Sequence, residues 1–341
     1  MFEVLIFALK ALVVVVSLGA LILLIAMLAA KAGQKSELEV EPLHKKYKDL
    51  AHFLKSFTAS KEELKAEAKA EKKKAKEDKK KEKESDHAHK KTVFVLNFDG
   101  DVHASQVENL REEVTAVLQT ATPLDEVVVR VESPGGVVHG YGLAAAQLIR
   151  IRDQKIPLTI CVDAVAASGG YMMACVANKV LAAPFAIVGS IGVVAQVPNF
   201  HRVLKKYDVD YKEYTAGDYK RTVSLLGEIT PKGEEKFQER LVDTHVLFKN
   251  FVSKFRPQVD IAKVATGEYW FGEEAVKMGL VDELKTSDEY LLSFDKDTPI
   301  FELNHQSKRS LADKISDLAG RALVTAFTKI WTSLEKQKFI S

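Results

Sequence analysis

The chain has 341 residues, of which 47% are hydrophobic, and its formal net charge at pH 7 is +2. This length and apolar content suffice for one sizeable domain with attached segments, and the balanced charge argues against a nucleic-acid-binding protein. The two cysteines, Cys161 and Cys175, stand in apolar stretches without metal-ligand spacing, which excludes a disulfide framework and predicts reduced, buried thiols.

The first segment in chain order is apolar. From Ala11 to Ala30 it contains 20 residues without a charge, bounded by Lys10 and Lys31. Because this is the length that crosses a hydrocarbon core as a helix, residues 1–33 are expected to be a transmembrane anchor rather than a cleavable signal. Lysines are more frequent after the stretch than before it, which favours a cytoplasmic main domain, but long domains also cross membranes despite flanking charge. The side of the membrane therefore stays open.

Residues 34–91 are expected to form a stalk. From Glu41 to Ser60, apolar residues recur every three to four positions, which predicts an amphipathic helix that packs on another surface. From Lys61 to Lys91 there are 13 lysines, nine acidic residues and almost no bulky apolar side chains. This composition cannot bury a core and favours a solvated helix or linker over a lipid-binding basic segment.

Residues 92–290 alternate between strand and helix patterns, which predicts a layered α/β domain. Helices are expected after a capping-box pattern formed by Ser105 and Glu108, after Gly136, after Ser168 and from Pro231 onward. The expected strands are 93–98, 126–131, 157–162 and 180–183.

The last segment, residues 291–341, is expected to be an extension that carries an amphipathic helix. Apolar residues recur at helical spacing between Leu311 and Leu334, with lysine and arginine between them. Core packing, docking to a membrane surface and contact with a neighbouring subunit all fit this pattern.

Two polar residues in the domain suggest nucleophilic catalysis. Ser168 stands in Val165-Ala166-Ala167-Ser168-Gly169-Gly170-Tyr171, where small residues let a strand turn sharply into a helix. A serine hydroxyl is a weak nucleophile unless a base removes its proton, and an uncharged lysine amine in an apolar pocket is one such base. Lys220, in Gly217-Asp218-Tyr219-Lys220, is the candidate for this role.

Glycines near the serine are candidates for stabilising a tetrahedral oxyanion. An expected strand runs into Ser133-Pro134-Gly135-Gly136 and then into a helix, so the amides of Gly135 and Gly136 can point at one position, and Gly169 adds another amide. Taken alone, Pro-Gly-Gly is most often a simple tight turn. Ser190, in Gly189-Ser190-Ile191-Gly192, either orients the lysine amine or caps a turn.

A serine-histidine-aspartate triad is the nearest competing mechanism. His201 is the sole histidine between Ser168 and Lys220, and it is expected at the start of an exposed helix. His139 fits a hydrogen-bonded structural residue at a helix start better than a base. The chain also has no Gly-x-Ser-x-Gly elbow, which argues against an α/β-hydrolase, and an acyl-CoA enzyme of the crotonase type has no use for a serine with a downstream lysine.

These motifs together resemble the signal peptide peptidase A family of serine peptidases. The resemblance covers about Thr92 to Leu284 and rests on five motifs in the family's order: Glu132-Ser133-Pro134-Gly135-Gly136, Ala167-Ser168-Gly169-Gly170-Tyr171, Gly189-Ser190-Ile191-Gly192-Val193, Gly217-Asp218-Tyr219-Lys220 and Gly279-Leu280-Val281-Asp282. It implies that Ser168 is the nucleophile and Lys220 its general base. It also implies a spiral of strand-strand-helix units like that of Clp protease and crotonase.

The resemblance extends to the setting of the reaction. It implies a single-pass protease of the bacterial inner membrane that forms homo-oligomers and needs no metal or nucleotide cofactor. It also implies that adjacent subunits complete one another's clefts and cleave apolar peptides or damaged proteins near the bilayer. Glu268 departs from the family pattern, which often has arginine there, so no role of that arginine is transferred. The alternative is a catalytically silent membrane scaffold that retains the peptidase fold.

Overall fold

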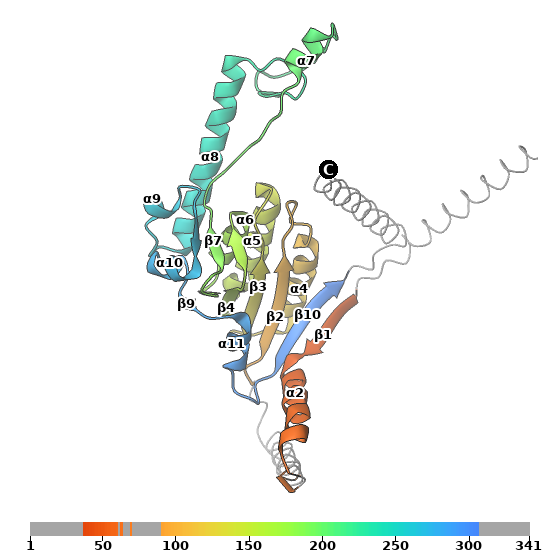
Figure 1. The fold of residues 1–341 in the computed structure, drawn as a ribbon, viewed down its shortest axis with the longest axis vertical. Coiled ribbons are helices and arrows are strands. Elements are labelled where there is room, and N and C mark those ends of the chain that lie inside the picture. The colour runs from red at the N-terminus through yellow and green to blue at the C-terminus, as the bar shows by residue number, and fades with distance from the viewer. Residues whose placement is uncertain (1–36, 61, 64–68, 70–89, 307–341) are drawn as a thin grey trace, which may run out of the picture. The chain divides into compact units, whose positions relative to one another are not determined.

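A computed structural model describes residues 37–60, 62–63, 69 and 90–306 (Figure 1). The chain divides into two compact units, and the unit Val40–Asn304 holds nearly all of the described residues. The anchor expected at residues 1–33, most of the lysine-rich segment and the expected C-terminal helix lie outside them. Of the helices in the described part, none combines the length and apolar character that a bilayer span requires.

A seven-stranded sheet forms the centre of the fold (Figure 1). Its order is β1-β10-β2-β3-β4-β6-β9, and neighbouring strands from β10 to β9 are parallel. Each of the four strands expected from the sequence is present with its ends shifted by no more than one residue. The strands are β1 (Glu37–Pro42), β2 (Val93–Asp99), β3 (Glu126–Glu132), β4 (Leu158–Val162), β6 (Lys179–Ala182), β9 (Glu283–Leu284) and β10 (Ile300–Gln306).

Both faces of the central strands are buried, which explains their continuous runs of β-branched residues. In β3, Val127 and Val129 belong to the larger core, whereas Val128 points to the smaller core on the opposite face. The larger core is covered by α4 (Val107–Thr120), α5 (Val138–Asp153), α6 (Gly169–Ala174) and the C-terminal part of α8 (Pro231–Phe255). The smaller core is covered by the start of α2 (Leu43–Thr58) and by α11 (Ser287–Leu292).

Two helix starts expected from the sequence have different outcomes. The side-chain oxygen of Thr230 accepts the N–H of Gly233 at 3.1 Å and caps α8, as expected for a threonine before proline. The capping box expected at Ser105 is wrong. The Ser105 hydroxyl instead donates to Asp101 Oδ2 at 2.6 Å, and α4 begins at Val107 without a side-chain cap.

A smaller sheet continues from the carboxyl end of β3. It consists of β5 (Val165–Ala167), β7 (Ile187–Gly189) and β8 (Tyr269–Phe271), with β5 parallel and β8 antiparallel to β7. Ser133 forms a parallel bridge with Ala166, which joins this sheet to the end of β3. The chain thus passes through one strand of each sheet before entering α6, and repeats the two-strand pattern in β6 and β7.

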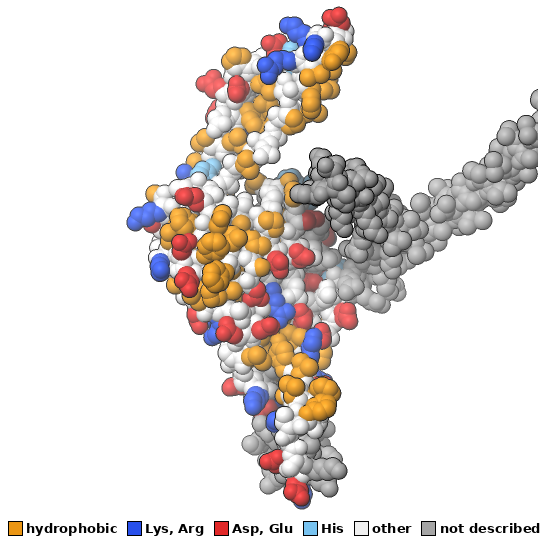
Figure 2. All heavy atoms as spheres, viewed as in Figure 1, with side chains coloured by type: hydrophobic (Ala, Val, Ile, Leu, Met, Phe, Trp, Pro, Cys, Tyr) orange, Lys and Arg blue, Asp and Glu red, His pale blue; other side chains and the backbone are white. Residues whose placement is uncertain are grey.

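A long projection, here called the arm, consists of residues 193–243. It contains α7 (His201–Lys206) and the N-terminal half of α8, which rises away from the sheets (Figure 1). Helix α8 has 25 residues, so it is about 37 Å long. Hydrophobic side chains are exposed along the arm (Figure 2), and the most exposed are Val194, Tyr207, Tyr214, Val203, Val209 and Val242.

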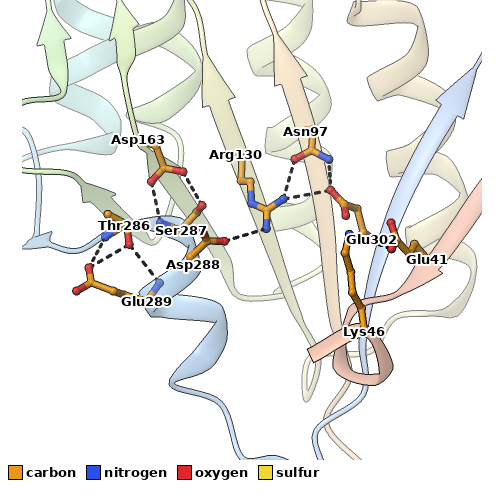
Figure 3. A network of polar contacts seen from close by, with 10 residues as sticks. All are labelled: Glu41, Lys46, Asn97, Arg130, Asp163, Thr286, Ser287, Asp288, Glu289 and Glu302. Carbon is orange, nitrogen blue, oxygen red and sulfur yellow. Dashed lines mark hydrogen bonds and ion pairs between the residues drawn. The ribbon is translucent and has the colours of Figure 1, made fainter. Parts of the chain in front are cut away.

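Polar contacts fix α11 to the sheet (Figure 3). Asp163 accepts the N–H of Ser287 at 2.8 Å and its hydroxyl at 2.5 Å. Arg130 of β3 contacts Glu302 of β10 at 3.1 Å and Asp288 of α11 at 3.8 Å. These contacts connect α11 to the end of β4 and to β3, so the position of the helix is set by the sheet.

An ion pair with a buried arginine fixes α8 against the body. The guanidinium of Arg256, next to the end of α8, contacts both carboxylate oxygens of Asp282 at 2.8 Å and donates to the Gly279 carbonyl at 2.8 Å. Arg256 is 2% exposed. The hydroxyl of Tyr171 in α6 donates to the Leu280 carbonyl at 2.9 Å, so α6 and α8 share this anchoring segment.

Replacing Asp282 with alanine is expected to destabilise the fold strongly, because it leaves the Arg256 guanidinium buried without its carboxylate. The expected loss is about 3–5 kcal/mol in the free energy of unfolding, measured by urea denaturation of the detergent-solubilised chain. Asp243→Ala is the control, since it breaks an exposed ion pair with Arg240 and is expected to change stability by less than about 0.5 kcal/mol. Similar losses in both variants would contradict this assignment.

Candidate functional site

A cavity of about 570 Å³ lies where β3 and β5 end and their helices α5 and α6 begin. In parallel α/β folds, ligands bind at this edge because strand ends, turns and helix N-termini meet there. The cavity is lined by residues from both turns, from the segment after β7 and from α8. They include Gly135, Gly136, Ser168, Gly169, Ser190 and the apolar Met172, Val193 and Phe248.

Ser168 occupies the sharp turn between β5 and α6. Its backbone has φ of 51° and ψ of −115°, a conformation that costs a non-glycine residue free energy. The turn is held because the Ser168 N–H donates to the Gly189 carbonyl at 2.7 Å and its own carbonyl accepts from Met172 at 2.9 Å. The strained turn places the partly exposed side chain at the cavity and the N-terminus of α6 beside it.

The turn after β3 makes contact with the Ser168 turn through a glycine. Gly135 has φ of +88°, and a Cβ atom added to it would lie 2.7 Å from the Ala167 carbonyl oxygen, the Gly169 nitrogen and the Ser168 Cβ. No side chain fits between the two turns, so the backbone of Gly135 packs directly on the serine turn. The structure thus brings together Ser168 and the glycines singled out in the sequence.

A buried hydrogen-bond network holds the turn after β3, and sequence reasoning missed it. The Ser133 hydroxyl accepts the N–H of Gly135 at 3.0 Å and lies 2.5 Å from the Tyr141 hydroxyl. The Tyr141 hydroxyl also lies 2.7 Å from the Asp101 carbonyl, to which it donates. Burial raises the pKa of Tyr141. Unlike the amide of Gly135, the amides of Gly136 and Gly169 donate no hydrogen bond among the described contacts.

Ser190 lies at the cavity, on the strand end opposite Ser168. Its N–H donates to the Glu268 carbonyl at 2.8 Å, and its hydroxyl is 3.4 Å from the Gly267 carbonyl. Its φ is +51°, so this residue also occupies a strained turn. Glu268 therefore contributes to the site through its backbone, while its exposed carboxylate accepts a hydrogen bond from Thr266.

Lys220 does not line the cavity of its own copy. It is exposed on the arm, next to Tyr219, whose ring lies 5.4 Å from Lys232 Nζ and 5.3 Å from Lys236 Nζ. Helix α8 reaches the cavity at Thr244, eight residues beyond Lys236, which corresponds to about 12 Å along the axis. The structure therefore separates Lys220 from Ser168 within one chain.

His139 and His201, the two histidines weighed in the sequence, do not line the cavity. His139 is exposed, and His201 begins α7 on the arm. His245 of α8 does line the cavity, which sequence reasoning did not anticipate. Its Nε2 lies 3.1 Å from the Ile191 carbonyl, and since a carbonyl only accepts, this nitrogen carries a proton. His245 thus connects α8 to the segment after β7.

Both cysteines are buried and free, as the sequence predicts. Burial raises the pKa of Cys161 to about 12 and raises that of Cys175 further. A thiol that is buried and protonated is a poor nucleophile. Neither residue lines the cavity, so both belong to the packing of the core.

The strain at Ser168 gives a prediction that does not depend on activity. Ser168→Gly is expected to increase the free energy of unfolding by about 1 kcal/mol relative to Ser168→Ala, because glycine adopts a positive φ without a Cβ clash. Both substitutions remove the hydroxyl, so the comparison isolates the backbone. Equal stability of the two variants in urea denaturation would show that the turn is unstrained.

Comparisons with known proteins identify the family of this chain. The chain matches the N-terminal domain of peptidase family S49 over residues 1–148 and the peptidase family S49 domain over residues 150–300. It is 50% identical over 295 residues to a probable protease SohB of Haemophilus influenzae, covering 84% of each chain. A probable protease SohB of Buchnera aphidicola is 47% identical over 243 residues, which cover 71% of this chain and 72% of the relative.

A more distant relative is Protease 4 of Salmonella typhi, 28% identical over 195 residues, which cover 57% of this chain and 30% of that protein. These relatives confirm the resemblance that the five motifs indicated. The mixed α/β fold with parallel strand-helix units also fits a peptidase domain of this kind. The chain belongs to peptidase family S49.

Proposed function

We propose that the protein is a membrane-anchored serine endopeptidase in which Ser168 is the nucleophile and Lys220 the general base. One observation carries this proposal: Gly135 packs directly against Ser168 and the Gly169 amide at the edge of the cavity. A nucleophile on a strained turn, next to backbone amides at a helix N-terminus, is an arrangement suited to attack on a carbonyl. Membership of a peptidase family supports a peptide carbonyl as the target.

The reaction proceeds in two halves. The uncharged amine of Lys220 takes the Ser168 hydroxyl proton as Oγ attacks the peptide carbonyl carbon, and the resulting oxyanion accepts hydrogen bonds from backbone amides. Because the Gly135 amide already donates to Ser133, we assign the oxyanion to the amides of Gly136 and Gly169. The amine product leaves with a proton from Lys220, and water then hydrolyses the acyl-enzyme with Lys220 as base.

Lys220 reaches Ser168 from a neighbouring copy in this proposal. The lysine is exposed on the arm and does not line the cavity of its own chain. The arm also exposes many large hydrophobic side chains, including Tyr207 at 70% and Tyr214 at 89%, which a second copy would bury. Contact with a neighbouring copy would also supply the apolar surroundings that keep the amine uncharged. Ser190, which lines the cavity, is assigned to orient that amine.

The proposed substrates are extended, apolar segments of peptides or damaged proteins. Met172, Val193 and Phe248 give the cavity apolar walls, and Gly135 and Gly169 leave room for a substrate backbone beside Ser168.

We further propose that residues 1–33 anchor the chain once across the bacterial inner membrane, and that the domain is a spiral of the Clp protease and crotonase type. The two-strand units β4–β5 and β6–β7 support this fold.

Alanine variants test the mechanism. Ser168→Ala and Lys220→Ala are each expected to reduce casein cleavage by at least about a thousandfold while the proteins stay folded. His245→Gln is the control for a serine-histidine mechanism and is expected to keep activity within about tenfold of the parent, because the proposed base is Lys220 and glutamine can still donate to the Ile191 carbonyl. Full casein cleavage by the Ser168 or Lys220 variant would contradict this mechanism, and loss confined to Ser168 and His245 would replace the base. No cleavage by the parent protein would favour the silent scaffold.

Mixing two inactive variants tests where the base comes from. If each site combines Ser168 of one copy with Lys220 of the next, unfolding and co-assembling Ser168→Ala with Lys220→Ala restores intact sites. Random assembly gives roughly a quarter of the parental activity. If both residues acted within one copy, every site in the mixture would lack one of them. Activity no higher than in the separate variants would therefore contradict a shared site.

A further inference from the structure

Helix α2 carries an apolar stripe that the described residues cover only at its start. Leu43 is 2% exposed and Tyr47 is half-buried, and both pack against the smaller core. The four large apolar residues that follow are 55 to 74% exposed: Leu50, Phe53, Leu54 and Phe57. At 3.6 residues per turn they fall within an arc of about 100°, so they form one continuous stripe. Figure 2 shows hydrophobic side chains at the surface in this region.

The charge of α2 is distributed away from this stripe. The helix contains four lysines and one aspartate. Lys45, Lys48 and Lys55 fall on the side opposite the exposed leucines and phenylalanines, and Lys46, on the apolar side, is paired with Glu41 at 3.0 Å. A short helix with leucine and phenylalanine on one side and lysine on the other has the composition of helices that lie in a membrane interface.

A second cavity, of about 320 Å³, adjoins α2 and is separate from the site of Ser168. Its apolar wall includes Tyr47, Ala51, Leu291, Leu292 and Phe294. Its charged lining residues are Lys48, Lys55, Lys296 and Asp295, an excess of two positive charges. Lys48 contacts Asp297 at 3.7 Å, and since both side chains are more than half exposed, this pair is weak and leaves Lys48 able to bind another anion.

The position of α2 in the chain indicates what lies against the stripe. The 20 uncharged residues end at Ala30, and α2 begins at Leu43. Twelve residues separate the two, so the start of α2 lies within about 43 Å of the end of the apolar segment. This step rests on the proposed anchoring of residues 1–33 in a bilayer, which then keeps α2 close to the lipid surface.

We propose that α2 binds the surface of an anionic lipid bilayer. The stripe from Leu50 to Phe57 lies at the boundary between headgroups and acyl chains, and the lysines around the second cavity bind lipid phosphate. The apolar stripe supplies burial and the lysines supply attraction to anionic headgroups. The start of α2 packs on the smaller core together with α11, and α11 is fixed to the sheet. A bound α2 therefore holds the peptidase body next to the membrane. Its substrates would then be polypeptides near the bilayer.

Site-directed spin labelling of the full chain in vesicles of phosphatidylglycerol and phosphatidylethanolamine tests this proposal. Leu54→Cys and Phe57→Cys place labels on the stripe, and Lys45→Cys places a matched control on the opposite side. The two native thiols are buried with raised pKa values, and labelling of the parent chain measures their background. Labels at positions 54 and 57 are expected to be severalfold more accessible to oxygen, relative to a water-soluble nickel complex, than the label at 45.

Equal accessibility at all three positions would overturn the proposal. So would strong spin–spin coupling at 54 and 57 that persists in detergent, because it would show that a second copy covers the stripe. Replacing Lys48 and Lys296 with glutamate is expected to lower the relative oxygen accessibility of the labels at 54 and 57 to the value measured in neutral phosphatidylcholine vesicles. If that accessibility does not depend on lipid charge, the proposed phosphate site is excluded.

The same samples separate this inference from the proposed function. If the chain floats with the vesicles and cleaves casein while the labels at 54 and 57 remain in water, only the proposed lipid binding of α2 is contradicted. If the chain does not float with the vesicles, the proposed membrane anchoring by residues 1–33 is contradicted, and the inference depends on that anchoring. If the labels at 54 and 57 are buried in lipid but the chain does not cleave casein, the proposed mechanism is contradicted and the lipid-binding surface of α2 stands.

Discussion

The contact between two turns determines the rest of the site. Gly135 and the Ser168–Gly169 turn approach so closely that any Cβ at Gly135 would overlap backbone atoms. The approach is fixed on both sides by hydrogen bonds within the larger core. Ser133 bridges to Ala166, its hydroxyl joins Gly135 to Tyr141, and the Ser168 N–H binds the end of β7. A rigid core thereby stabilises a serine turn that would be unfavourable in an isolated peptide.

The fold places the proposed nucleophile and its proposed base on parts of the molecule with different properties. Ser168 stands on the sheet core, whereas Lys220 stands on an arm whose hydrophobic side chains face solvent in a single chain. A copy on its own therefore holds the proposed nucleophile and oxyanion amides, and the described residues that line its cavity include no lysine. Under the proposed mechanism, activity depends on assembly, which would limit cleavage by unassembled chains before they reach the membrane.

Much of this architecture could be predicted because local pattern and tertiary environment agree. The apolar runs of β2 and β3 are buried on both faces, and Thr230-Pro231 starts α8 as its sequence indicates. The motifs also grouped the glycines with Ser168 at one cavity. The features that the sequence did not predict depend on competition between hydrogen-bond partners or on contacts between residues that are far apart in the sequence. Asp101 takes the Ser105 hydroxyl that was expected to cap α4, and strands of two or three residues such as β5 and β9 have no periodicity to detect.

The role of Tyr141 and the location of Lys220 required coordinates, because neither follows from spacing along the chain. The most direct measurement is a cryo-electron microscopy structure of the assembled protein in a lipid nanodisc. We expect Lys220 Nζ of one copy to lie within hydrogen-bond reach, about 3 Å, of Ser168 Oγ in the next copy. Assemblies that cleave casein while every Lys220 stays in solvent, far from any Ser168, would contradict it.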